Sequence, residues 1–250
     1  SGLVTLGLLH QPKRAISTMK IRYLFLLLLL SPFTHAECVI LLHGLARTDN
    51  SMDKLQAALV KEDFTVINVR YESTKNTIET LAPSAIDPAL EKCGVGIGVN
   101  FVTHSMGGIL VRQYLSQKPL PQLNKVVMLG PPNKGSEVVD VLGQFPGFHF
   151  VNGDAGLQLG TGQSSVPNTL GAVDFDLGII AGSRSINLIL SAIIPGPDDG
   201  KVTIENTKIQ GMTDHIEMPV THPFMMRNED VINQVIYYLR HGSFSREAIQ

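Results

Sequence analysis

The residues most able to do chemistry lie around Ser105, in the segment Phe101-Val102-Thr103-His104-Ser105-Met106-Gly107-Gly108. An apolar run precedes this serine and a helical pattern follows it, so a sharp strand-to-helix turn is predicted there. Such a turn strains the serine backbone and needs small neighbours, most often glycine two residues before and after. Gly107 keeps the second position, whereas Thr103 replaces the first. We therefore predict a nucleophilic serine mainly from the strand before it and the helix after it.

A serine hydroxyl needs a base to remove its proton, and the oxyanion formed by its attack needs hydrogen-bond donors. The helix after Ser105 presents the backbone N–H of Met106 at its positive end. The loop after the first predicted strand, His43-Gly44-Leu45, can turn at glycine and aim the Leu45 N–H at the substrate. These two N–H groups are the predicted oxyanion hole. His43 itself is assigned a structural role, because it lies far upstream of the serine.

The base is expected to follow the serine in the chain. The histidines after Ser105 are His149, His215, His222 and His241. His222 is favoured because Pro219 and Pro223 bound its loop just before the last predicted helix. His215, in the same late segment, remains the alternative.

The acid is expected between the serine and the base. The turn-rich segment 195–202 contains Asp198 and Asp199, and Gly200 permits the tight turn that directs a carboxylate at an imidazole. Asp199 is the predicted acid, and Asp198 is its immediate alternative. Asp174, Asp176 and Asp214 are more distant candidates.

These residues require a scaffold, and the pattern alternates short β-branched runs with helical stretches. This alternation is typical of an α/β fold with a mostly parallel, doubly wound sheet and helices on both faces. The predicted strands are 38–42, 65–69, 99–103, 126–129 and 177–181, with a sixth at 207–212. The predicted helices are 50–60, 77–92, 107–115 and 231–239, the second interrupted or restarted at Pro83 and Pro88. The glycine-rich segment 143–171 is predicted to be a long, irregular surface excursion.

The N-terminal part is predicted to be removed. Residues 19–36 combine a basic start at Lys20 and Arg22, a leucine-rich run and a small residue at Ala36, which is typical of a secretory signal peptide. Cleavage is expected after Ala36, and residues 1–18 are interpreted as extraneous or disordered. Residues 37–250 form the single predicted domain of an exported protein, periplasmic or secreted.

Charge and cysteine content limit which ligands and covalent cross-links can be expected. Residues 37–250 carry 16 basic and 22 acidic residues, so nucleic acid is not expected to bind. Cys38 and Cys93 are the two cysteines of the chain, and an exported protein meets an oxidising environment. A Cys38–Cys93 disulfide and a pair of buried thiols are the open alternatives. No histidine or cysteine cluster has metal-ligand spacing, so neither metal nor cofactor is predicted.

Taken together, the motifs resemble the lipase and esterase branch of the α/β-hydrolase superfamily, from Val39 through the last predicted helix. The resemblance implies that Ser105 forms an acyl-enzyme, His222 transfers the proton, Asp199 orients His222, and Leu45 with Met106 holds the oxyanion. It also suggests that Asn133 or Ser136 lines the pocket. The implied function is hydrolysis of small-molecule or lipid carboxylic esters, with transient contact to a lipid surface.

Two other functions remain open on the same fold. An acyltransferase would use the same Ser-Asp-His set and deliver the acyl group to an alcohol or thiol. A catalytically silent binding protein is disfavoured by the intact set of three side chains, although fold alone does not decide function. The segment 143–171 lacks a large apolar lid, which favours short or medium acyl chains.

Overall fold

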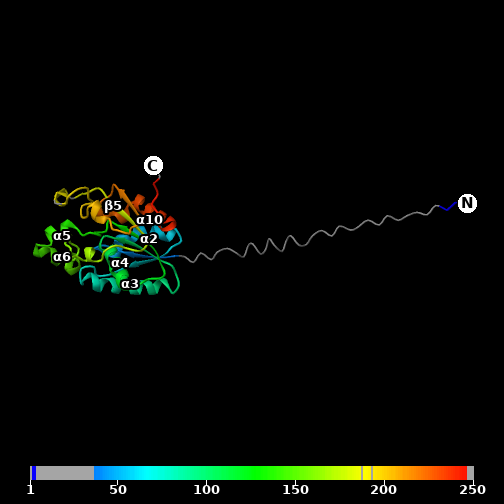
Figure 1. Cartoon of the computed structure of the whole chain (residues 1–250), viewed down its shortest axis with the longest axis horizontal. Helices are drawn as coiled ribbons and strands as arrows, with labels where there is room; N and C mark the ends of the chain where they lie inside the picture. Colours follow the sequence, from blue (N-terminus) through cyan, green and yellow to red (C-terminus); the bar gives the residue numbers. More distant parts are fainter. Residues whose placement is uncertain (1, 4–36, 187, 193, 247–250) are drawn as a thin grey trace. The chain divides into compact units, whose positions relative to one another are not determined.

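Six parallel strands form the central sheet of the computed structural model, which describes residues 2–3, 37–186, 188–192 and 194–246 (Figure 1). The sheet order is β2-β1-β3-β4-β5-β6, and the described residues from 37 onward form one compact unit. The strands are β1 (Cys38–Leu42), β2 (Thr65–Val69), β3 (Val99–His104), β4 (Leu123–Leu129), β5 (Leu177–Gly182) and β6 (Asp214–Met218). The predicted signal peptide, 19–36, lies outside the described residues.

Helices connect the strands. They are η1 (Asp49–Met52), α2 (Asp53–Lys61), α3 (Ile78–Cys93), α4 (Met106–Gln117), α5 (Glu137–Leu142), α6 (Pro146–Leu157), α7 (Val166–Thr169), α8 (Leu188–Ser191), α9 (Ile204–Thr207), η2 (His222–Arg227) and α10 (Glu229–His241). No helix in the described part of the chain is long and apolar enough to cross a membrane.

Two apolar layers enclose the sheet, as the α/β pattern predicted. On β1, Ile40 and Leu42 pack with α3 and α4, whereas Val39 and Leu41 pack with α2 and α10. Figure 1 shows α3 on one side of the sheet and α2 with α10 on the other. Since successive side chains of a strand point to opposite faces, a strand covered on both sides reads as a continuous apolar run. The doubly wound, parallel α/β fold is therefore confirmed.

The strand order creates a switch point between β1 and β3. The chain leaves β1 toward β2 on one side, then crosses back and continues outward from β3 to β4. Loops after β1 and β3 therefore diverge, and this divergence opens a crevice at the carboxyl edge of the sheet. Ser105 follows β3 and Leu45 follows β1, so both lie at this crevice.

The sixth strand differs from its prediction. Thr207 ends α9, and the strand at this edge is β6, seven residues further on. β6 pairs with β5 alone, so its polar residues can face solvent and it does not read as a buried strand. His215 consequently lies inside a strand and not in a loop.

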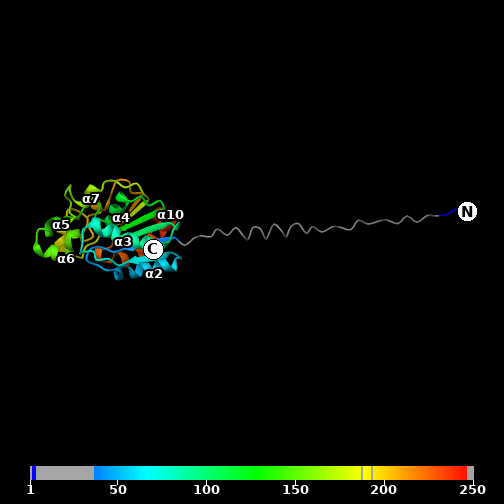
Figure 2. The same cartoon turned by 90° about the horizontal axis from the view of Figure 1, so that it is seen from below.

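Two further helical predictions need correction. α3 runs without interruption through Pro83 and Pro88, because its apolar face is buried against the sheet. The segment 143–171 contains α6 and α7, so it is partly helical and not irregular throughout. Pro146 opens α6, a position that favours proline, but Gly153 breaks its helical geometry with φ +64° and its periodicity is weak. Both views show α5 and α6 together at one end of the unit (Figures 1 and 2).

A disulfide joins Cys38, the first residue of β1, to Cys93, the last residue of α3, with 5.6 Å between the Cα atoms. The cross-link closes a loop over a sequence separation of 55 residues. It ties β1 to a helix that covers one face of the sheet. Of the two alternatives for these cysteines, the disulfide is therefore confirmed.

We expect the Cys38→Ala/Cys93→Ala variant to lose about 2–5 kcal/mol of unfolding free energy, because the unfolded chain regains loop entropy. Urea unfolding followed by circular dichroism measures this loss. Wild-type protein unfolded with and without reductant provides the control, since it changes no side-chain volume. An unchanged midpoint under reduction, or two alkylatable thiols in the native protein, would contradict the stabilising role.

Candidate active site

Ser105 lies on the sharp turn between β3 and α4, with φ 54° and ψ −123°. A positive φ at a residue other than glycine is costly, on the order of 1–3 kcal/mol, and persists only when the surroundings hold it. The Ser105 backbone N–H donates to the Leu129 carbonyl at 2.8 Å, which anchors the turn to β4. A Cβ on Gly107 would lie 2.6 Å from the Leu42 carbonyl oxygen. Glycine is therefore required at this position for α4 to approach β1.

The threonine at the first motif position is accommodated by a neighbouring glycine. Thr103 is fully buried, and its Oγ1 lies 3.2 Å from where a Cβ on Gly108 would be. Because Gly108 has no Cβ, it leaves room for the threonine side chain where the common motif has a glycine at position 103. Gly108 lies one helix position beyond the glycine of the common motif, Gly107. This second glycine is the feature in the sequence that offsets the departure from the common motif.

A chain of hydrogen bonds links Ser105, His222 and Asp199. The Ser105 Oγ lies 3.0 Å from His222 Nε2, and His222 Nδ1 lies 2.7 Å from Asp199 Oδ2. Both His222 and Asp199 are buried. A carboxylate only accepts hydrogen bonds, so Nδ1 carries the proton and Nε2 is left to accept from the serine.

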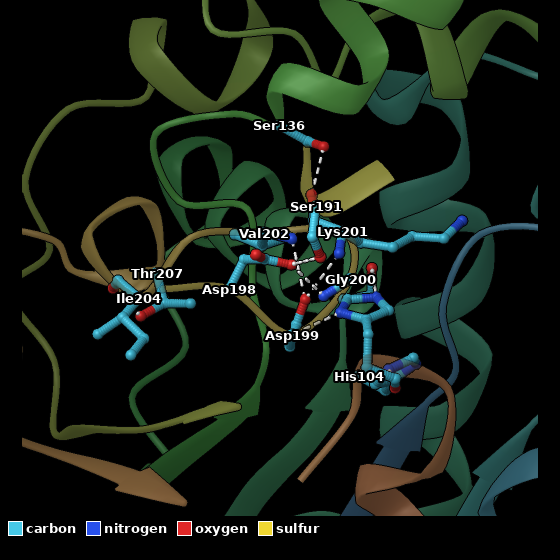
Figure 3. A network of polar contacts seen from close by, with 12 residues as sticks. His104, Ser136, Ser191, Asp198, Asp199, Gly200, Lys201, Val202, Ile204 and Thr207 are labelled. Carbon is cyan, nitrogen blue, oxygen red and sulfur yellow. Dashed lines mark hydrogen bonds and ion pairs between the residues drawn. The ribbon is translucent and has the colours of Figure 1, made fainter. Parts of the chain in front are cut away.

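The Asp199 carboxylate is held by its own turn (Figure 3). Its Oδ1 accepts from the backbone N–H groups of Lys201 at 3.0 Å and Val202 at 2.9 Å. Gly200, with φ +99°, makes this turn possible. The His222 backbone N–H also donates to the Asp199 carbonyl at 2.9 Å, so the two loops are joined through main chain and side chain.

The alternative acid and base lie elsewhere. Asp198 Oδ1 accepts from the Ser191 hydroxyl at 2.9 Å and the Gly200 N–H at 2.6 Å, which makes Asp198 a brace for the turn. His215, within β6, has its Nε2 3.0 Å from Thr207 Oγ1. Neither Asp198 nor His215 joins the hydrogen-bond chain of Ser105.

The loop after β1 packs directly against the serine. A Cβ on Gly44 would lie 2.8 Å from His104 Nδ1 and 3.1 Å from the Ser105 Cβ. The next residue, Leu45, lines the same cavity as Ser105. Met106 is the first residue of α4, where a backbone N–H has no intrahelical acceptor. The two residues predicted to supply the donors therefore both lie near the serine, Leu45 across the cavity and Met106 next in the chain.

His43 keeps this loop in place. Its ring stacks on Tyr71 with 4.0 Å between centroids, and its Nδ1 lies 2.9 Å from the Gly44 carbonyl oxygen. The Tyr71 hydroxyl donates to the His43 carbonyl. Burial lowers the pKa of His43, which favours the neutral ring. These contacts agree with the structural role predicted for His43.

Two residues that pack against the hydrogen-bond chain, His104 and Gly130, were not predicted from the sequence to belong to the site. His104 is buried, and its Nε2 lies 2.9 Å from the His222 carbonyl oxygen, so this ring supports the His222 main chain. Burial is the largest cause that holds the pKa of His104 well below its ordinary value, and electrostatic interactions with His222 and Arg47 lower this pKa further. Gly130 has φ +54°, and a Cβ there would lie 2.9 Å from Asp199 Oδ2. In the sequence, the position of Gly130 directly after a predicted strand was the one indication that it contributes to the site.

A cavity of about 220 Å³ adjoins the serine. Its apolar wall includes Leu45, Val138, Val139, Phe148 and Leu159, and its polar wall includes Ser136, Arg47 and Lys201. Asn133, the other residue predicted to line the pocket, is fully buried and donates to the Thr207 carbonyl at 2.8 Å. Of the two predicted residues, only Ser136 lines this cavity.

Within the described residues, no group of three or more histidine, cysteine, aspartate or glutamate side chains is arranged to hold a metal ion.

Comparisons with known proteins agree with this architecture at the level of the fold. No protein-family model matches the chain, and no curated protein matches it by sequence. Among solved structures, mature Bacillus licheniformis lipase BlEst2 matches with TM-score 0.63 and 15% identity, over 84% of this chain and 94% of that one. The Legionella pneumophila phospholipase PlaB matches with TM-score 0.63 and 19% identity, over 83% of this chain and 59% of that one. The metagenomic carboxyl esterase MGS0156 matches with TM-score 0.61 and 16% identity, over 76% and 65%.

The chain therefore has the α/β-hydrolase fold, and the predicted resemblance to lipases and esterases is confirmed at the level of the fold. It spans 94% of BlEst2 but only about three fifths of PlaB.

We expect acid to destabilise the protein through His104. Its pKa lies below the ordinary 6.5 in the folded state, so the unfolded chain binds the proton first as the pH falls through that value. The free energy of unfolding should thus decrease between about pH 7.5 and about pH 5, and His104→Gln should make this decrease smaller. Part of the slope should persist, because burial also lowers the pKa of His43 and of His215.

Chemical denaturation at a series of pH values measures this slope. His149→Gln, which alters an exposed histidine, is the matched control. A wild-type slope in His104→Gln would show that the buried ring does not titrate as argued.

Proposed function

We propose that this protein is a serine carboxylic-ester hydrolase in which Ser105 is the nucleophile, His222 the general base and Asp199 the residue that orients His222. The observation that carries the proposal is the hydrogen-bond chain from Ser105 through His222 to Asp199, opening into a partly apolar cavity. A buried carboxylate, an imidazole and a serine in this order form the arrangement that activates a hydroxyl for attack on a carbonyl carbon.

Each step of acyl transfer has a matching group. His222 Nε2 accepts the proton as Ser105 Oγ attacks the ester carbon, and Asp199 stabilises the imidazolium that results. The Leu45 and Met106 backbone N–H groups donate to the oxyanion of the tetrahedral intermediate. His222 then protonates the departing alcohol, which leaves an acyl group on Ser105. Water, activated by the same imidazole, attacks this acyl-enzyme and releases the acid.

The size of the cavity supports short or medium acyl chains. Pockets for drug-sized ligands usually occupy about 300–1,000 Å³, and this one is smaller. The apolar side chains of Phe145, the residue before α6, and Phe150, within α6, are 61% and 90% exposed. Because Phe148 and Asn152 of the same helix line the cavity, these exposed side chains support the predicted contact with a lipid surface, which stays a prediction.

We expect nitrophenyl esters of short and medium acids to be cleaved faster than long-chain esters, and Ser105→Ala to abolish cleavage across the series. Loss of a nucleophile or base from such a set typically lowers kcat by several powers of ten. His222→Ala and Asp199→Asn should show comparable losses, whereas the matched controls His215→Ala and Asp198→Asn should retain most activity. Equal rates for wild type and Ser105→Ala would refute the proposal.

A competing alcohol in the same assay separates hydrolysis from acyl transfer. If the acyl group goes mainly to water, the product is the free acid and the enzyme is a hydrolase. A dominant new ester would assign the acyltransferase function instead.

We also propose that the protein is exported and processed after Ala36. The Cys38–Cys93 disulfide supports this proposal, because stable disulfides belong to oxidising compartments. Mass spectrometry of the exported protein should find an N-terminus at Glu37. Recovery of the chain only in the cytosol, with residues 19–36 retained, would contradict export.

A further inference from the structure

We infer that the ester recognised at this site carries an anionic group, and that Arg47 and Lys201 bind it. This inference rests on the proposed function and deepens it, because it concerns the substrate class of the same cavity. The shared chemistry is a phosphate or a carboxylate attached to the ester.

Two separate loops bring positive charge to the cavity. Arg47 follows β1, two residues beyond Leu45, and Lys201 lies two residues beyond Asp199. Both side chains line the cavity together with Ser105 and His222. Each cation therefore lies two residues from a residue of the proposed catalytic machinery. This short separation keeps the cation near the reacting ester.

Neither cation has an ion-pair partner among the described residues. The ion pairs in this part of the chain involve other basic residues and leave Arg47 and Lys201 out. Among the described residues that line the cavity, Asp199 is the one carboxylate, and its oxygens already accept from His222 and from backbone N–H groups. Figure 3 shows the Lys201 side chain extending away from the Asp199 carboxylate. The positive charge therefore remains free to bind a ligand.

The charge of Arg47 acts on Lys201. Burial and the positive charge of Arg227 lower the pKa of Arg47, and burial and the positive charge of Arg47 lower the pKa of Lys201, whereas the negative charge of Asp199 raises it. Like charges that line one cavity repel each other until an anion joins them. An anionic group between them would relieve this repulsion and form charge-assisted hydrogen bonds.

Size and charge distribution identify the class of anion. The remaining walls of the cavity are largely apolar and its volume is about 220 Å³, which suits an acyl chain beside one charged group. The chain as a whole has a net charge of −2, so long polyanions such as nucleic acids gain no general attraction. A small ester that combines a hydrocarbon chain with a single anionic group fits both features.

Two pairs of matched esters test the inference. The phosphate pair is 1-butyrylglycerol 3-phosphate against 1-butyrylglycerol, and the carboxylate pair is mono(4-nitrophenyl) glutarate against 4-nitrophenyl valerate. We expect kcat/KM to favour the anionic member of at least one pair by about tenfold or more at low salt, the magnitude typical of a hydrogen bond to a charged group. The pair with the larger preference identifies the anion. Added salt should reduce the preference.

Variants then assign the preference to residues. Arg47→Gln and Lys201→Gln should each lower the anionic-to-neutral ratio of kcat/KM by about tenfold. The matched control, Lys61→Gln, alters an exposed lysine at the end of α2 and should keep the wild-type ratio. Because both rates in a ratio come from the same preparation, a partly folded variant does not distort it.

Equal kcat/KM within both pairs, or a wild-type ratio in both Arg47→Gln and Lys201→Gln, would overturn the inference. If the neutral esters are nevertheless cleaved and Ser105→Ala abolishes that cleavage, the proposed function stands alone. Absence of Ser105-dependent cleavage of all four esters would overturn the proposed function and this inference with it.

Discussion

The left-handed backbone of Ser105 requires three parts of the chain to meet within a few ångströms. β3 ends one residue before Ser105, α4 begins directly after it, and the loop after β1 packs against its side chain. Such a conformation is unfavourable for serine and persists because the surrounding contacts enforce it. Gly44 and Gly107 stand where a Cβ would collide with the turn or with β1. The rest of the site depends on this turn, since it projects the hydroxyl into the crevice at the switch point.

The parallel sheet brings the partners of Ser105 to the same edge. Asp199 lies in the connection that follows β5 and His222 in the segment that follows β6, while backbone donors follow β1 and β3. Their final alignment requires the backbone of neighbouring loops to approach Asp199 closely. Gly130 and Gly182 allow it, because a Cβ on either would lie less than 3.0 Å from an atom of Asp199. The buried His104 adds a hydrogen bond to the His222 carbonyl.

Much of this arrangement could be predicted because it depends on local patterns. Continuous apolar runs identified the five strands β1 to β5, and turn chemistry identified the loop of Asp199. The misplaced sixth strand shows the limit of that approach: β6 is a polar edge strand whose register is set by pairing with β5. α6 was missed for a similar reason, since its helical geometry is broken at Gly153 and its apolar side chains are partly exposed.

By itself, the sequence determined the α/β alternation, the order of serine, acid and histidine, and the strand-to-helix context of Ser105, because these depend on residue types at short spacing. The sequence favoured His222 over His215 and Asp199 over Asp198. Only the tertiary structure shows which of these residues lie within hydrogen-bonding distance: His222 of Ser105, and Asp199 of His222. It also decided that Arg47 and Lys201, 154 residues apart in the chain, share one cavity. Distances between remote residues follow from how the sheet orders its strands, and no local pattern encodes that order.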